Sequence, residues 1–135
     1  ALSDGGTRPD TALLEGSDGL TLLMARAAVR AECRGGTVEL TALTPNGRAL
    51  VEALSGDERL TLHFDPPVTL DAEERLLAPA PLHAVRALLH AALPPAAHPF
   101  GVLALGVIGF DHAGFGEDMP VQAPNAADFP DYIFW

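Results

Sequence analysis

A glycine pair between two short apolar segments is the feature that most constrains the fold of this chain. Gly35 and Gly36 separate residues 28–33 from residues 37–42, where apolar side chains alternate with polar ones. Alternation with a period of two is typical of a strand with one face in water. Two consecutive glycines favour a tight hairpin turn. We therefore predict that both segments are strands and that they pair antiparallel.

Two further segments carry the spacing of amphipathic helices. Residues 48–54 follow a Thr-Pro-Asn-Gly turn and end before Gly56, and residues 81–93 begin with a proline. Proline suits the first turn of a helix, and glycine suits the residue that follows its last turn. The alternation in residues 60–64 predicts another strand, which the prolines at 66–67 should end. We therefore predict two main helices and at least three strands.

The C-terminal third contains two more apolar segments. Residues 102–108 are apolar without alternation, which predicts a strand buried on both faces, and glycines at such positions usually mark a bulge or a close backbone approach. Residues 132–135 read Tyr-Ile-Phe-Trp and predict a final strand. We expect this strand to pack against protein beyond the given sequence. The predicted fold class is α+β, with mostly antiparallel sheet and two main helices; residues 20–25 fit either strand or helix.

Charge and composition exclude several classes of function. The chain has 135 residues, enough for one domain of about 100–150 residues, and its net charge is −10. A surplus of acidic groups opposes binding to nucleic acid and to anionic membranes. Cys33 is the only cysteine, so a disulfide within the chain is impossible. We predict a cytoplasmic domain, with no nucleic-acid or membrane partner.

The titratable side chains form no recognisable catalytic pattern. His83 and His90 are seven residues apart, whereas two helical zinc ligands are typically four apart. Asp111 and His112 place a carboxylate beside an imidazole, but neither a nucleophile nor a third ligand accompanies them. We interpret the histidines as surface or core-edge residues and predict no catalytic or metal-binding residue. A small hydrolase that uses Asp111 and His112 is a further alternative.

Short motifs occur in a fixed order along nearly the whole chain. They are Arg8-Pro9, Leu13-Leu14-Glu15-Gly16, Leu22-Leu23-Met24, Asn46-Gly47, Pro66-Pro67-Val68, Ala84-Val85-Arg86, Phe110-Asp111, Glu117-Asp118-Met119-Pro120 and Pro130-Asp131-Tyr132. In this order they resemble the N-terminal part of anthranilate synthase component I, the chorismate-using large subunit of tryptophan biosynthesis. Related enzymes that make aminodeoxychorismate or isochorismate share the Phe110-Asp111 motif. The early Leu-Leu-Glu segment favours the anthranilate or aminodeoxychorismate branch.

The resemblance implies that residues 1–135 form a single N-terminal regulatory and scaffolding domain, which stops before the catalytic part. In the intact enzyme that part converts chorismate and ammonia or glutamine to anthranilate and pyruvate, and it holds Mg²⁺. No cofactor is therefore expected in this chain. The implied partners are the catalytic part of the same subunit, a glutamine amidotransferase subunit and tryptophan as an inhibitor.

The resemblance also implies which residues would contact tryptophan. Leu14, Glu15 and Gly16 match the effector segment of the family, and Arg86 would support them from a helix. The Glu15 carboxylate could accept a charge-assisted hydrogen bond from the tryptophan ammonium. Gly16 stands where the family has a serine, and the chain has no lysine to match the family's. We therefore predict weakened or absent tryptophan feedback.

Two other identities are compatible with the same motifs. The chain could be the equivalent domain of aminodeoxychorismate synthase component I, or of a relative in secondary metabolism. It could also be a free-standing module that binds a small molecule or a protein.

Overall fold

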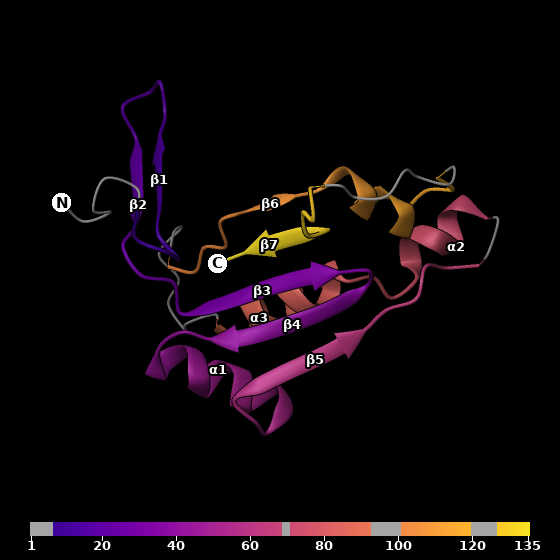
Figure 1. The fold of residues 1–135 in the computed structure, drawn as a ribbon, viewed down its shortest axis with the longest axis horizontal. Coiled ribbons are helices and arrows are strands. Elements are labelled where there is room, and N and C mark those ends of the chain that lie inside the picture. The colour runs from indigo at the N-terminus through magenta and orange to yellow at the C-terminus, as the bar shows by residue number, and fades with distance from the viewer. Residues whose placement is uncertain (1–6, 69–70, 93–100, 120–126) are drawn as a thin grey trace.

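A five-stranded antiparallel sheet and a separate two-stranded ribbon organise the computed structural model (Figure 1). The structure describes residues 7–68, 71–92, 101–119 and 127–135. Within these ranges, the fold is α+β with mostly antiparallel strands, as predicted. The elements in chain order are β1 (Ala12–Glu15), β2 (Thr21–Met24), β3 (Val29–Arg34), β4 (Thr37–Ala42), α1 (Pro45–Ser55), β5 (Arg59–His63), α2 (Ala72–Leu77), α3 (Leu82–Ala92), β6 (Gly106–Ile108), a 3₁₀ helix (Phe110–Phe115) and β7 (Tyr132–Phe134).

The predicted glycine hairpin joins β3 to β4. The strands pair antiparallel from Val29 opposite Ala42 to Arg34 opposite Thr37. Gly35 and Gly36 have φ angles of 53° and 74°, in the left-handed region that only glycine enters at little cost. The prediction from alternation and turn composition is confirmed.

The two main helices are also confirmed, each with small shifts at its ends. α1 begins at Pro45, where the Thr44 hydroxyl accepts a hydrogen bond from the Gly47 amide at 3.1 Å. It ends before Gly56, whose φ of 77° makes the expected left-handed cap. α3 begins at Leu82, one residue after the proline that was expected to start it.

The short helix α2 has no counterpart among the sequence predictions. The Asp71 carboxylate caps it by accepting a hydrogen bond from the Glu74 amide at 2.9 Å. None of its residues is buried. A helix as short and as exposed as α2 has no apolar stripe with helical spacing, so the sequence pattern did not indicate a helix. The capping residue Asp71 was the one sequence signal of its start.

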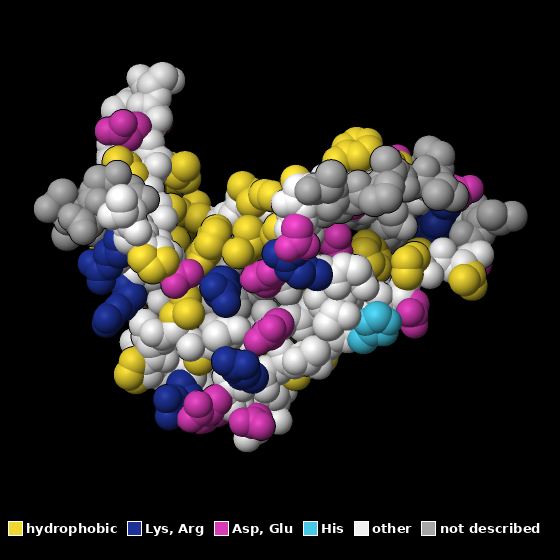
Figure 2. Space-filling view, in the orientation of Figure 1, with side chains coloured by type: hydrophobic (Ala, Val, Ile, Leu, Met, Phe, Trp, Pro, Cys, Tyr) yellow, Lys and Arg dark blue, Asp and Glu magenta, His cyan; other side chains and the backbone are white. Residues whose placement is uncertain are grey.

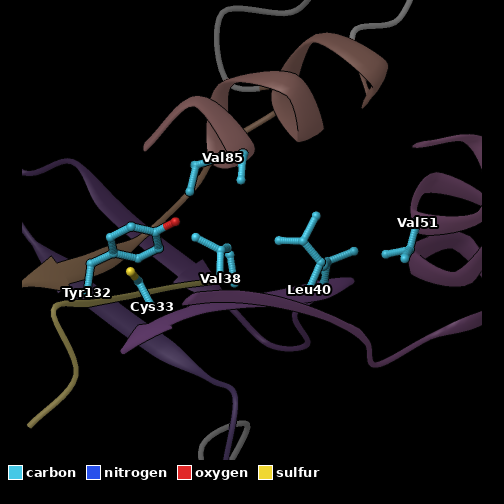
Figure 3. Packing of buried hydrophobic residues seen from close by; sticks show 9 residues of the cluster. Cys33, Val38, Leu40, Val51, Val85 and Tyr132 are labelled. Atoms are coloured by element: carbon cyan, nitrogen blue, oxygen red, sulfur yellow. The ribbon is translucent and has the colours of Figure 1, made fainter. Parts of the chain in front are cut away.

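The hydrophobic core lies between the sheet and the helices α1 and α3 (Figure 3). It combines alternate residues of β3 and β4 with Tyr132 of β7, Val51 of α1, and Ala84 and Val85 of α3. Val38 and Leu40 of β4, Val51 of α1 and Tyr132 of β7 have no exposed surface. Cys33 of β3 and Val85 of α3 complete the set of residues labelled in Figure 3.

The C-terminal strand β7 lies inside the sheet, between β3 and β6. Tyr132 pairs with Cys33 on one side and with Ile108 on the other. Its hydroxyl donates a hydrogen bond of 2.8 Å to the Pro81 carbonyl. The strand itself is confirmed, but the expectation that it must pack against protein beyond the sequence is wrong for Tyr132. Segments distant in the sequence supply its partners, which local patterns cannot reveal.

The prediction for residues 102–108 is wrong in extent and in burial. Only Gly106–Ile108 form a strand, β6, and all three residues are exposed. β6 is an edge strand of the five-stranded sheet, so among the described strands its side chains have a neighbouring strand, β7, on one side only. The glycine prediction holds, because a Cβ at Gly106 would collide with the Ile133 carbonyl and the Phe134 ring.

Candidate functional site

The β1–β2 ribbon projects away from the five-stranded sheet (Figure 1). Its register places Leu14 opposite Leu22 and Leu13 opposite Leu23. Because side chains alternate along each strand, Leu14 and Leu22 lie on one face, and Leu13 and Leu23 lie on the other. Leu13 and Leu14 are each about half exposed, at 51% and 49%. The ribbon therefore presents leucines on both of its faces.

An apolar groove of about 590 Å³ lies between the ribbon and the chain that leads into β6. We call this groove the apolar valley. Figure 2 shows hydrophobic side chains gathered where the ribbon meets the sheet edge. The residues that line the valley are Leu22, Leu23, Met24, Ala25, Arg26, Gly101, Leu103 and Leu105.

A second apolar cavity of about 360 Å³ adjoins the valley. Val29 and Ala31 of β3 and Leu88 of α3 contribute to its walls, so it opens on the helical side of the sheet. Met24 and Leu103 line both hollows. The two hollows therefore meet at the base of the ribbon.

A polar contact joins the base of the ribbon to the sheet. The Trp135 indole N–H donates to the Asp10 carboxylate at 2.6 Å, and the Asp10 carbonyl accepts from the Ala27 amide at 3.3 Å. The main chains of Trp135 and Leu105 exchange two hydrogen bonds, at 2.8 and 2.9 Å. Sequence reasoning missed these contacts because each of them joins segments that are distant along the chain.

The predicted effector residues occupy two different elements. Leu14 and Glu15 end β1, whereas Arg86 is exposed on α3. Leu14 and Glu15 are consecutive in the strand, so their side chains point to opposite faces of the ribbon. Among the described contacts, no hydrogen bond or ion pair joins Glu15 to Arg86. Their role in tryptophan binding stays a prediction.

The turn after Glu15 explains why a glycine occupies position 16. The Gly16 amide donates to the Leu20 carbonyl at 2.8 Å, and the Leu20 amide donates to the Asp18 carboxylate at 3.1 Å. A Cβ at position 16 would meet that same carboxylate and the Leu20 carbonyl. A serine at this position therefore requires the Asp18 side chain to move.

His112 and Cys33 occupy structural positions. The His112 ring packs against Phe115 and Tyr132, with ring centroids 5.6 and 5.5 Å apart. Burial lowers the pKa of His112, partly opposed by the nearby Asp131 carboxylate. Burial and Asp131 raise the pKa of the Cys33 thiol to about 12, so it is not a ready nucleophile. This agrees with the core-edge interpretation of His112 and offers no support for a hydrolase.

The described ranges contain no group of three or more His, Cys, Asp or Glu side chains that could hold a metal ion. No helix in these ranges is long and apolar enough to cross a membrane. The cytoplasmic location stays a prediction.

The site is thus an apolar surface on an α+β domain, formed by a leucine-bearing ribbon and a sheet edge. No protein-family model matches the chain. An anthranilate synthase component 1 of Vibrio cholerae is 30% identical over an alignment of 127 residues that covers 85% of this chain and 24% of that protein. A pyocyanine-specific anthranilate synthase component 1 of Pseudomonas aeruginosa is 37% identical over an alignment of 120 residues that covers 80% of this chain and 22% of that protein.

The similarity confirms the resemblance that the ordered motifs indicated. The chain is related over most of its length to anthranilate synthase component 1. It spans less than a quarter of the length of the curated relatives that it matches.

Proposed function

We propose that this chain is the regulatory and scaffolding domain of an anthranilate synthase large subunit. The apolar valley carries this proposal, because it is a surface suited to packing against another part of the protein. That part would be the catalytic part of the subunit, which converts chorismate and ammonia to anthranilate and pyruvate with Mg²⁺. A glutamine amidotransferase subunit would supply the ammonia.

The stability of the ribbon supports a docking role for the valley. A two-stranded ribbon is marginally stable by itself in water. Leu14 and Leu23 remain 49% and 40% exposed in the described structure. Covering such side chains contributes about 25 cal/mol for each Å² of apolar surface removed from water. A docked partner would therefore stabilise the ribbon as well as bind the domain.

A chimera tests the proposal directly. This chain replaces the matching segment of the Pseudomonas aeruginosa relative, and anthranilate formation from chorismate, ammonia and Mg²⁺ is measured. We expect a folded, active chimera. A double variant, Leu103→Ser with Leu22→Ser, should lose activity because both substitutions place hydroxyls in the valley. Arg48→Ser, on the exposed surface of α1, is the matched control. An inactive parent chimera, or a double variant as active as its parent, would contradict the proposal.

We further propose that tryptophan regulation is weak in this domain. The Glu15 carboxylate remains available for an ammonium group, but Gly16 offers no hydroxyl and the chain has no lysine. A missing hydrogen-bond partner for a buried ligand group lowers affinity roughly 5- to 150-fold. Micromolar binding of tryptophan to the chimera, measured by calorimetry, would contradict this part of the proposal.

Restoring the hydroxyl provides the complementary measurement. Gly16→Ser should raise tryptophan affinity, and Gly16→Ala, which adds the Cβ alone, should not. Both variants must displace the Asp18 carboxylate, which is the end of a flexible side chain, so we expect each to cost less than about 1 kcal/mol of stability. Equal tryptophan affinities for the two variants would show that position 16 does not contact the ligand.

A second candidate is the same domain in a secondary-metabolism enzyme. The relative with 37% identity is named for pyocyanine, and weak feedback by tryptophan would suit an enzyme outside tryptophan biosynthesis. Mass spectrometry of the chimera's product does not decide this, because the catalytic part comes from the relative. The sequence that flanks this chain in its source genome would decide between the two.

A further inference from the structure

Among the residues that the structure describes, no strand pairs with the outer edge of β6, so the main chain of β6 offers hydrogen-bonding positions at this edge of the sheet. In an antiparallel pair, alternate residues direct their N–H and C=O groups towards the partner strand. Leu105 exchanges hydrogen bonds with Trp135, and the Gly109 amide donates to Asp131 at 2.7 Å. Val107, opposite Ile133, is therefore the next residue that bonds to β7. Gly106 and Ile108 direct their main-chain groups away from β7.

The two edges of the sheet differ in how they are protected. At the β5 edge, Arg59 lies 3.6 Å from Glu39 and His63 lies 3.2 Å from Asp65. Charged side chains on an edge strand discourage the addition of another strand. β6 carries no charged residue, and Val107 and Ile108 are 48% and 53% exposed. The β6 edge therefore lacks the protection that the β5 edge has.

We propose that the β6 edge binds an extended strand from the catalytic part of the large subunit, extending the five-stranded sheet. This inference rests on the proposed function and specifies how the two parts join. Gly106 and Ile108 would exchange main-chain hydrogen bonds with that strand, as in other cases of strand addition.

Three observations favour this occupant. The relatives extend over more than three quarters of their length beyond the part that this chain matches. Leu105 lines the apolar valley, and Val107 follows it on the same face of β6, so an added strand would continue the valley. A second copy is disfavoured, since each chain carries a net charge of −10.

The geometry also defines the chemistry of the added strand. Its residues alternate between two faces, with one row beside Val107 and the other beside Ile108. Both rows of side chains on the added strand should be apolar, because Val107 and Ile108 beside them are apolar. The residues that bond to Gly106 and Ile108 cannot be proline, which has no amide hydrogen to donate.

Amide hydrogen exchange gives a residue-level test with an internal control. In the isolated chain, the Val107 amide should exchange slowly, and the Gly106 and Ile108 amides should exchange rapidly. In the active chimera, all three should exchange slowly. Rapid exchange at Gly106 and Ile108 in an active chimera would overturn the inference while leaving the proposed function intact. Slow exchange at both residues in the isolated chain would also overturn it.

A proline substitution in β6 tests the same edge by its effect on association between this chain and the catalytic part. Ile108→Pro removes an amide that makes no bond to β7, so the isolated chain should fold. Strand addition would then leave a carbonyl of the partner unpaired, and we expect association with the catalytic part, supplied as a separate polypeptide from the Pseudomonas relative, to weaken roughly 5- to 150-fold.

Two comparison variants make the proline result specific. Ile108→Ala removes the side chain but keeps the amide, and its association should exceed that of Ile108→Pro. Val107→Pro removes an amide that bonds to β7, so it should destabilise the isolated chain. Equal association of the alanine and proline variants at position 108 would overturn the inference. If the unmodified chain does not associate with the catalytic part, the proposed function fails, and the inference fails with it.

Discussion

The outer face of the five-stranded sheet has two halves of opposite character. Over β3, β4 and β5, charged side chains of both signs are interspersed, whereas the β7–β6 half adjoins the apolar valley (Figure 2). The charged half contains the ion pairs Arg30–Glu32, Arg34–Glu32 and Arg59–Glu39. The apolar half carries Val107 and Ile133, which are opposite each other in adjacent strands.

The difference shows that one sheet can serve two roles at once. Exposed ion pairs contribute only about 0–1 kcal/mol each, but they keep that half of the face and its edge hydrated. An exposed apolar patch on a protein surface usually marks an interaction site. This difference therefore predicts that the charged half, over β3, β4 and β5, stays in water and that the apolar half, over β7 and β6, is covered by another part of the protein.

The largest expected effect is a difference in stability between substitutions on the two faces of β7. Tyr132→Ala empties a fully buried position and should lower the free energy of unfolding by about 3–5 kcal/mol. Ile133→Ala changes a partly exposed side chain on the other face and should cost about 1 kcal/mol. Urea denaturation of the two variants measures both values. Equal losses would show that the outer face of β7 is as well packed as the inner one.

The next effect concerns the link between ribbon and sheet. Asp10→Ala leaves the Trp135 indole without its carboxylate partner and should cost about 1.5–3 kcal/mol. Trp135 is the only tryptophan, so its fluorescence reports the change directly. Asp57→Ala, at an exposed loop position, is the matched control. Unchanged fluorescence and stability in Asp10→Ala would show that the apolar contacts alone hold the ribbon.

A smaller effect is expected at the edge of the core near the 3₁₀ helix. Burial lowers the pKa of His112 below its ordinary value of 6.5. The unfolded chain therefore binds more protons than the folded chain as the pH falls below about 6.5, and stability should decrease. His112→Phe should remove this part of the decrease, and His90→Gln, on the exposed face of α3, should retain it. Identical pH profiles for wild type and His112→Phe would contradict the prediction.

The smallest effect is expected in the charged half. A double-mutant cycle with Arg59→Ala and Glu39→Ala should give a coupling energy within about 1 kcal/mol, because both side chains are well exposed. The coupling should decrease further in high salt. A coupling above about 2 kcal/mol would show that this half is held together more strongly than its exposure suggests.

Local sequence patterns predicted the elements whose burial follows from their own periodicity. Alternation in β4 and the Gly35–Gly36 turn identified the hairpin, and helical spacing after Pro81 identified α3. These signals work because one strand face or helix stripe must leave water. The same reasoning failed for residues 102–108, since an apolar run does not show which side of it another strand will cover.

The candidate site was predictable only in part. Leu14, Glu15 and Gly16 were found through their resemblance to a family motif, and the ribbon that carries them was not predicted. Leu103 and Leu105 belong to a segment that was expected to be buried. Leu103 is 44% exposed and Leu105 is partly exposed, because the segment leads into an edge strand, and the position of a strand at the edge is a property of the whole sheet.

The sequence by itself determined the hairpin, the two main helices, the α+β class and the relationship to anthranilate synthase component 1, because each depends on local periodicity or on ordered motifs. Only the tertiary structure decided that β7 lies inside the sheet and that β6 forms its edge. Strand order depends on contacts between segments such as Cys33 and Tyr132, which are distant along the chain. The division of the outer face into a charged half and an apolar half follows from that order.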